Sequence, residues 1–184
     1  MRIGLVGEAP NDTESMKNLL IKRYPIEKFN FFSMLQIING SNLDSQKTKR
    51  FLRIEFEQQK PDIVIFIRDL DSTLPNKEKL YERKNYFTSS NNVVNKKGIP
   101  LLHIHEIEAL ILTDVETFNN KYGAKIEEIE NVMKIEEPKE FLKNASKKYN
   151  ESHNSDIFKL INFDKTLNCI YFDRFIKNLD KILK

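Results

Sequence analysis

A continuous hydrophobic run, Ile-Val-Ile-Phe-Ile, occupies residues 63–67, shortly after Pro61. A run this short and apolar on both faces is typical of a central strand in a parallel sheet, because helices cover both sides of such a strand. At residue 68 the character of the sequence changes abruptly, to Arg68-Asp69-Leu70-Asp71. The pattern therefore predicts a buried strand with an acidic carboxyl end.

The rest of the N-terminal part alternates between strand-like and helix-like patterns. Strands are predicted at residues 2–7, 29–38 and 98–105. Helices are predicted to begin after a cap at Asn11 or Asp12, and to occupy residues 44–59, 76–86 and 106–114. Strands that alternate with helices indicate right-handed crossovers and a parallel sheet. We therefore predict an α/β, Rossmann-like core over residues 1–114, with a mostly parallel four-stranded sheet flanked by helices.

From residue 115 onward the pattern changes, and no convincing strand follows. Residues 125–150 are highly charged and are predicted to be helical, with a break at Pro138. Apolar residues at helical spacing over 172–183 predict an amphipathic closing helix. Residues 115–184 are therefore expected to form a helical C-terminal extension that packs on the core.

Composition narrows the class of protein. The chain has 184 residues, 40% of them hydrophobic, which suffices for one domain with a real core. The single cysteine, Cys169, excludes an internal disulfide and a cysteine-rich zinc site. No apolar run approaches the length of a membrane span, and a strand-like segment follows Met1-Arg2 where a signal peptide would lie. We expect a soluble cytoplasmic protein with no membrane partner.

Acidic residues follow two of the predicted strands. Glu8 comes after the first strand, and Asp69 and Asp71 come after the central one. The carboxyl ends of parallel strands meet at one edge of a sheet, which is where α/β proteins bind ligands. Alternation along an extended backbone places Asp69 and Asp71 on the same side, about 6–7 Å apart, where they repel each other unless a cation lies between them. A divalent ion with oxygen ligands, Mg²⁺ or Mn²⁺, is the expected cofactor.

This arrangement resembles the Toprim domain of topoisomerases, primases and overcoming-lysogenization-defect (OLD) nucleases. The match consists of Val6-Gly7-Glu8 and Arg68-Asp69-Leu70-Asp71, with Ala9 where the family usually has glycine. The stretch 106–114 is similar to a Glu-x-Glu-Ala-aromatic-Leu-Leu-Ala-Asp stretch of small stand-alone Toprim-like bacterial proteins, with Leu110 at the aromatic position. The resemblance implies a Mg²⁺-dependent nuclease, with Glu8, Asp69 and Asp71 as catalytic residues, and anti-phage defence beside an ATPase partner.

Further residues are candidates for supporting roles. Glu108, and after it Glu106, are predicted to complete a second metal position, since two metals would stabilise both the attacking and the leaving oxygen of phosphoryl transfer. Arg68, Lys77 and Lys84 are predicted to contact the phosphates of a nucleic-acid substrate, DNA or RNA. The resemblance implies that Glu8 shares the metal or acts as a general acid or base.

Other interpretations stay open at this point. Arg68 can simply neutralise the acids, and the lysine-rich segments are more often solvated helix faces. His103 and His105 are better explained as structural histidines than as metal ligands. The main alternative for the whole chain is a non-catalytic metal-binding or regulatory module that docks on a partner ATPase.

Overall fold

The computed structural model describes residues 1–36, 42–72 and 76–183. Within them, β1 (Arg2–Val6), β2 (Asn30–Ser33), β3 (Ile63–Asp69) and β4 (Gly98–His103) form one sheet in the order β2-β1-β3-β4, and all its pairs are parallel. The predicted α/β fold with a four-stranded parallel sheet is confirmed. The central β3 is buried over its first six residues, as its apolar run predicted.

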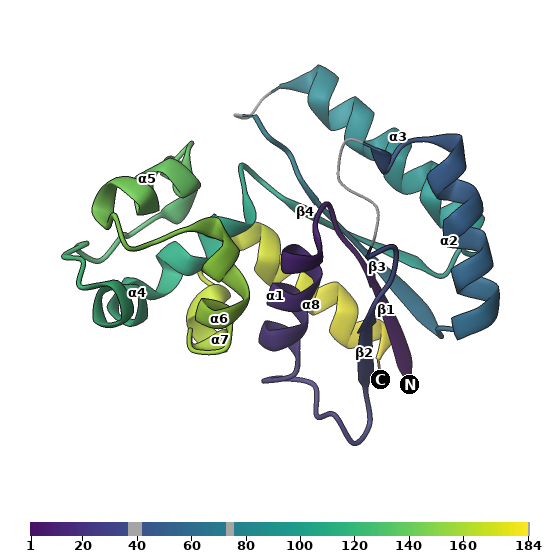
Figure 1. Ribbon diagram of the computed structural model, residues 1–184, viewed down its shortest axis with the longest axis horizontal. Coiled ribbons are helices and arrows are strands. Elements are labelled where there is room, and N and C mark those ends of the chain that lie inside the picture. Colours follow the sequence, from purple (N-terminus) through teal and green to yellow (C-terminus); the bar gives the residue numbers. More distant parts are fainter. Residues whose placement is uncertain (37–41, 73–75, 184) are drawn as a thin grey trace.

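Helices connect the strands and form the C-terminal part (Figure 1). The α-helices are α1 (Pro10–Leu20), α2 (Gln46–Gln59), α3 (Lys77–Val93), α4 (Val115–Tyr122), α5 (Pro138–Ala145), α6 (Asn154–Phe158), α7 (Phe163–Thr166) and α8 (Ile170–Ile182). Short 3₁₀ segments are η2 (Ile107–Asp114), η3 (Val132–Lys134) and η4 (Glu151–His153).

Each face of the sheet carries its own hydrophobic cluster. Ile65 and Ile67 of β3 belong to a large cluster shared with α1, α8 and the other C-terminal helices. Val64 and Phe66 belong to a smaller cluster shared with α2 and α3. Because successive side chains of a strand point to opposite faces, odd-numbered β3 residues face α1 and α8 and even-numbered ones face α2 and α3. Figure 1 shows these two helical layers on either side of the sheet.

The C-terminal helices pack directly on α1. Asn18 Nδ2 donates a hydrogen bond to the Ser155 carbonyl oxygen over 2.9 Å, and Asn11 Nδ2 donates one to the Glu151 carbonyl oxygen over 2.7 Å. These contacts place η4 beside the N-terminal end of α1, close to where β1 ends, and α6 along the same helix. In the part of the chain that the structure describes, no helix has the length and apolarity needed to cross a bilayer.

Several predicted boundaries were wrong. The second strand ends at Ser33, because Leu35 has a left-handed backbone (φ 57°) and donates its N–H to Glu55 Oε2; the predicted residues 37 and 38 lie outside the described part. Ala9 is the N-cap of α1, because Pro10 fits the first helical position. The third helix continues to Val93, well beyond residue 86.

The predicted helix over residues 125–150 was also wrong in large part. Only η3 and α5 are helical there. The Asn119 side chain accepts a hydrogen bond from the Ile126 N–H and donates one to the Ile126 carbonyl oxygen, which holds this segment in an extended form. Residues 107–114 form a 3₁₀ helix where an α-helical pattern was expected.

Candidate functional site

The parallel register brings the predicted acidic residues to one edge of the sheet. Val6 is aligned with Phe66, so two residues farther on Glu8 comes beside Arg68. Backbone hydrogen bonding between the segments that follow β3 and β4 continues as far as Asp71. The Asp71 N–H donates to the His105 carbonyl oxygen over 3.2 Å. The segment that follows His105 then carries Glu106 and Glu108 to the same edge.

Asp69 lies among other carboxylates. Burial raises the pKa of Asp69 well above its usual range, and the negative charges of Glu108, Asp12, Glu8 and Asp71 raise it further, in that order. As an odd-numbered β3 residue it faces the layer of α1 and the C-terminal helices, which supply its strongest acidic neighbours. A carboxyl group surrounded in this way holds a proton unless a cation offsets the repulsion.

Glu108 is the most deeply buried carboxylate of the group, with a residue exposure of 2%. Its Oε1 accepts a hydrogen bond from Asn154 Nδ2 over 2.9 Å, and the Tyr149 hydroxyl donates to Asn154 Oδ1 over 2.7 Å. Its Oε2 is buried and has no hydrogen-bond partner among the described residues. Burial raises the pKa of Glu108, while the hydrogen bond from Asn154 opposes that shift. An oxygen left without a donor in such a position indicates a missing ligand.

Asp12 joins the group although the sequence analysis treated it only as a helix cap. Its Oδ2 accepts a hydrogen bond from the Ala9 N–H over 2.8 Å. Burial raises the pKa of Asp12 to about 6; the hydrogen bond from Ala9 opposes the rise, and the charge of Glu8 adds to it. The sequence feature that could have indicated Asp12 is its position in the first turn of the helix after β1. A side chain in that turn lies close to the carboxyl end of the strand.

Two arginines form ion pairs with the two other carboxylates predicted at the strand ends, Glu8 and Asp71. Arg68 Nε lies 2.6 Å from Glu8 Oε1, and its guanidinium lies 4.5 Å from the centre of the Tyr86 ring on α3. Arg83 Nη2 lies 2.8 Å from Asp71 Oδ2, and Arg83 Nε donates to the Asp69 carbonyl oxygen over 2.7 Å. The ion pair expected as the alternative role of Arg68 is therefore present.

Asp69 and Asp71 have different neighbours, contrary to the expectation that they share one side. Asp71 has a left-handed backbone (φ 51°), which ends the extended alternation after β3. Its side chain pairs with Arg83 of α3, whereas Asp69 interacts with Glu108 and Asp12 on the opposite layer. Asp69 is thus the member of the pair that belongs to the carboxylate cluster.

Glu106 is held by Lys139 at the start of α5. The Lys139 N–H donates to Glu106 Oε2 over 2.9 Å, and Lys139 Nζ lies 3.5 Å from Glu106 Oε1 and 3.2 Å from Glu151 Oε2. Burial acts to lower the pKa of Lys139, but the charges of Glu108, Glu106 and Glu151 raise it overall. The sequence analysis did not anticipate Lys139, because nothing local in the charged segment distinguishes it from its neighbours.

The donor set suits a hard divalent cation in its chemistry, although the side chains do not form a closed site. Among the described residues, no three His, Cys, Asp or Glu side chains converge closely enough to hold a metal ion. The pKa values of Asp12, Asp69 and Glu108 are nevertheless all raised, chiefly by burial. Glu108 Oε2 has no hydrogen-bond donor among the described residues. Oxygen ligands of this kind fit Mg²⁺ or Mn²⁺, which complete their coordination with water.

The other candidates differ in exposure. Lys77 and Lys84 are exposed on α3, whereas Arg68 is 4% exposed and paired with Glu8. His103 is buried, and burial lowers its pKa to about 3. His105 Nε2 lies 3.3 Å from the Met133 carbonyl oxygen. His103 Nε2 and His105 Nδ1 are buried with no hydrogen-bond partner among the described residues, so the interpretation as structural histidines stays a prediction.

Comparison with known proteins gives one match. No curated protein and no solved structure matched the chain. A family model described as "Domain of unknown function (DUF4276)" matches residues 9–180, which include every candidate residue of the carboxylate edge except Glu8. Since this match covers nearly the whole chain, the protein belongs to the DUF4276 family.

Proposed function

We propose that this protein is a Mg²⁺-dependent nuclease that hydrolyses phosphodiester bonds of nucleic acid. The observation that carries the proposal is the crowding of Asp69 by other carboxylates beside an unpartnered oxygen of Glu108. A buried cluster of negative charge is costly unless it serves to bind a cation. The cluster lies at the carboxyl edge of a parallel sheet, and ligands of α/β proteins bind at this edge.

Asp69 and Glu108 are the residues best placed to hold the ion. Both have raised pKa values, and Glu108 is fixed by Asn154. Asp12 is a further ligand candidate, while Glu8 already engages Oε1 in its ion pair with Arg68. A bound divalent ion would supply charge stabilisation to the phosphoryl oxygens and a more acidic water.

The wider setting rests on the resemblance to Toprim domains. It supports a cytoplasmic bacterial protein that acts in anti-phage defence beside an ATPase partner. The resemblance also supports roles for Glu8, Asp69 and Asp71, the carboxylates that match its motif. On this proposal Lys77, exposed at the start of α3, contributes salt-dependent contact with phosphates.

Cleavage of labelled single- and double-stranded DNA and RNA in Mg²⁺ or Mn²⁺ tests the proposal. Asp69→Asn and Glu108→Gln remove charge with little change in shape and are expected to abolish cleavage. Glu127→Gln is the matched control, because Glu127 is an exposed carboxylate far along the chain from this edge. Wild-type protein that cuts nothing, or a cutting activity that both site variants retain, would refute the nuclease.

A non-catalytic metal-binding or regulatory module is the second candidate. It is favoured by the ion pairs Arg68–Glu8, Arg83–Asp71 and Lys139–Glu106, which already neutralise three of the predicted ligands. Isothermal titration calorimetry with Mg²⁺ and Mn²⁺ distinguishes the two candidates. Binding that Asp69→Asn abolishes, in a protein that cleaves none of the four substrates, would establish the module in place of the enzyme.

A further inference from the structure

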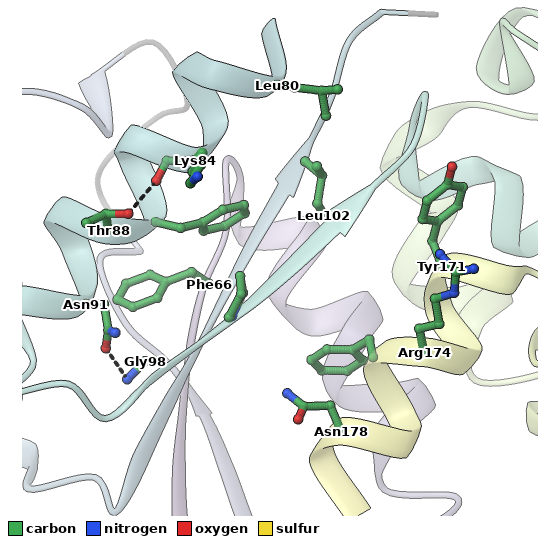
Figure 2. A pocket seen from close by; sticks show the side chains of 13 residues that line it. Phe66, Leu80, Lys84, Thr88, Asn91, Gly98, Leu102, Tyr171, Arg174 and Asn178 are labelled. Carbon is green, nitrogen blue, oxygen red and sulfur yellow. Dashed lines mark hydrogen bonds between the residues drawn. The ribbon is translucent and has the colours of Figure 1, made fainter. Parts of the chain in front are cut away.

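A groove lies along the outer side of β4, away from the carboxylate edge. It has a volume of about 690 Å³ and is bounded by α3 on one side and α8 on the other. Figure 2 shows Phe66 and Leu102 on the strands between the two helices, with Lys84 on α3 and Arg174 on α8. Its lining is mainly apolar and includes the rings of Phe66, Phe87, Tyr171 and Phe175.

The open edge of β4 is unsuited to pairing with another strand. Val64 donates its N–H to the Lys97 carbonyl oxygen. The backbone N–H and C=O groups of odd-numbered β4 residues therefore point toward β3, and those of even-numbered residues point away from the sheet. The Gly98 N–H donates to Asn91 Oδ1 over 2.8 Å (Figure 2). Pro100 has no N–H to donate. Of the outward positions in β4, only Leu102 retains a donor for an incoming strand. The groove is therefore better suited to a small ligand that binds through apolar and charge contacts than to a peptide strand that binds through backbone hydrogen bonds.

The charges that line the groove are all positive. Lys84 and Arg174 contribute them, and no carboxylate is among the lining residues that the structure describes. Neither cation forms an ion pair with any residue in the described ranges; Arg174 lies 5.9 Å from the Tyr171 ring centre. Unpaired cations on the walls of a mainly apolar groove are complementary to an anion with a flat apolar body.

We propose that the groove between α3 and α8 is a binding site for an aromatic anion, separate from the carboxylate edge. Its volume is in the range of about 300–1,000 Å³ that small-molecule sites have. The ligand's ring system would pack on the apolar lining of the groove, and its phosphate, carboxylate or sulfonate would pair with Lys84 or with Arg174. Nucleotides and aromatic carboxylates share this chemistry.

Fluorescence titration with 1-anilinonaphthalene-8-sulfonate, an aromatic anion, tests the proposal on the full chain. We expect saturable binding to one site, weakened about tenfold or more in the Lys84→Gln/Arg174→Gln double variant, since the double variant removes the charge-assisted contact whichever of the two cations supplies it. The neutral analogue N-phenyl-1-naphthylamine should bind the double variant and wild type alike. Lys147→Gln, at an exposed lysine outside the groove, is the matched charge control.

A second variant tests the place of binding. Asn178 is exposed on α8 and lines the groove, so Asn178→Trp fills it without disturbing the core. This variant should lose both probes while its circular dichroism spectrum and melting temperature stay unchanged. Binding of the sulfonate that survives Asn178→Trp, or that weakens equally in Lys147→Gln, would overturn the proposal.

Displacement of the bound probe separates the two sources of ligand. Displacement by adenosine or uridine monophosphate identifies a nucleotide site, whereas displacement by 2-naphthoate alone identifies an aromatic carboxylate site. If neither displaces the probe at millimolar concentration, the assignment of an aromatic anion is wrong. Asp69→Asn should leave probe binding unchanged, so a failure of this site is distinguishable from a failure of the nuclease.

Discussion

Asn154 Nδ2 donates a hydrogen bond to Glu108 Oε1 over 2.9 Å, and this contact joins α6 to the acidic edge of the sheet. The Tyr149 hydroxyl orients the Asn154 amide from behind, since it donates to Asn154 Oδ1. With Oε1 engaged by Asn154, Oε2 is the Glu108 oxygen that has no partner among the described residues. The C-terminal helices are therefore part of the candidate site.

Removing the Asn154 side chain should destabilise the fold. In Asn154→Ala a buried Glu108 oxygen loses its donor and the Tyr149 hydroxyl loses its acceptor, so we expect a loss of about 1–3 kcal/mol in the free energy of unfolding. Urea denaturation in EDTA measures it, with exposed Asn144→Ala as the control. Adding Glu108→Gln should recover part of the loss, because it removes the buried charge. Equal midpoints for Asn154→Ala and the control would contradict this account.

Asp69→Asn should stabilise the metal-free protein while it abolishes function. At pH 8 the metal-free wild type must either bind a proton at Asp69 or bear its repulsion from Glu108, Asp12 and Glu8. The substitution removes both costs, and we expect a gain of about 0.5–2 kcal/mol. Calorimetry in EDTA should therefore show a higher melting temperature than for wild type or for Glu127→Gln. Added Mg²⁺ should raise the melting temperature of wild type but not of Asp69→Asn. A lower melting temperature for Asp69→Asn in EDTA would show that the carboxylates are not under repulsive strain.

The stability of the metal-free protein should depend on pH through Asp12. Its pKa is about 6 in the folded chain and near 3.8 when unfolded, so between these values the folded state binds the additional proton. This contribution to stability is therefore lost as the pH rises from about 4 to about 6, and it stays lost above that range.

Asp12→Asn keeps an acceptor for the Ala9 N–H and removes the titration. The difference in unfolding free energy between Asp12→Asn and wild type should grow in favour of the variant by about 1–2 kcal/mol from pH 4.5 to pH 7. Urea midpoints at four pH values in EDTA measure it. A difference that stays constant with pH would show that Asp12 titrates normally. Mg²⁺ affinity should rise over the same interval, because binding requires the deprotonated carboxylates.

Neighbouring cations on α3 should behave in opposite ways. Arg83 is buried and holds both the Asp69 carbonyl oxygen and the Asp71 carboxylate, so Arg83→Gln should cost about 1–2 kcal/mol of stability. Lys84 is exposed, and Lys84→Gln should change stability by less than about 0.5 kcal/mol. Thermal denaturation of the two variants side by side checks this. If Arg83→Gln had the same melting temperature as wild type, the loop after β3 would not depend on these contacts.

The sheet was predictable because its signals are local. The apolar run of β3 and the acidic residues directly after it depend only on neighbours in the sequence, and parallel pairing follows from the alternation of strands and helices. The cluster around Asp69 was predictable only in part. Glu8 and Glu108 follow strands, whereas Asp12 returns to the edge through a helical turn that the sequence analysis used only for a cap.

The contacts from the C-terminal part could not be predicted. Lys139 and Asn154 reach Glu106 and Glu108 through tertiary packing of α5 and α6, and no periodicity in the charged segment encodes that packing. The same segment was expected to be helical because of its composition. Hydrogen bonds between the Asn119 side chain and the Ile126 backbone hold its first part extended, and such side-chain satisfaction of backbone groups overrides propensity.

The bond from Asn154 to Glu108 also sets an order of events during synthesis of the chain. All four strands have been made by the time residue 103 is added, but α6, which fixes Glu108, is still to come. A nascent chain that contains only the four strands therefore has an unfinished acidic edge. On the proposed function, a ribosome-bound or prematurely terminated chain that lacks α6 would be unable to cut nucleic acid.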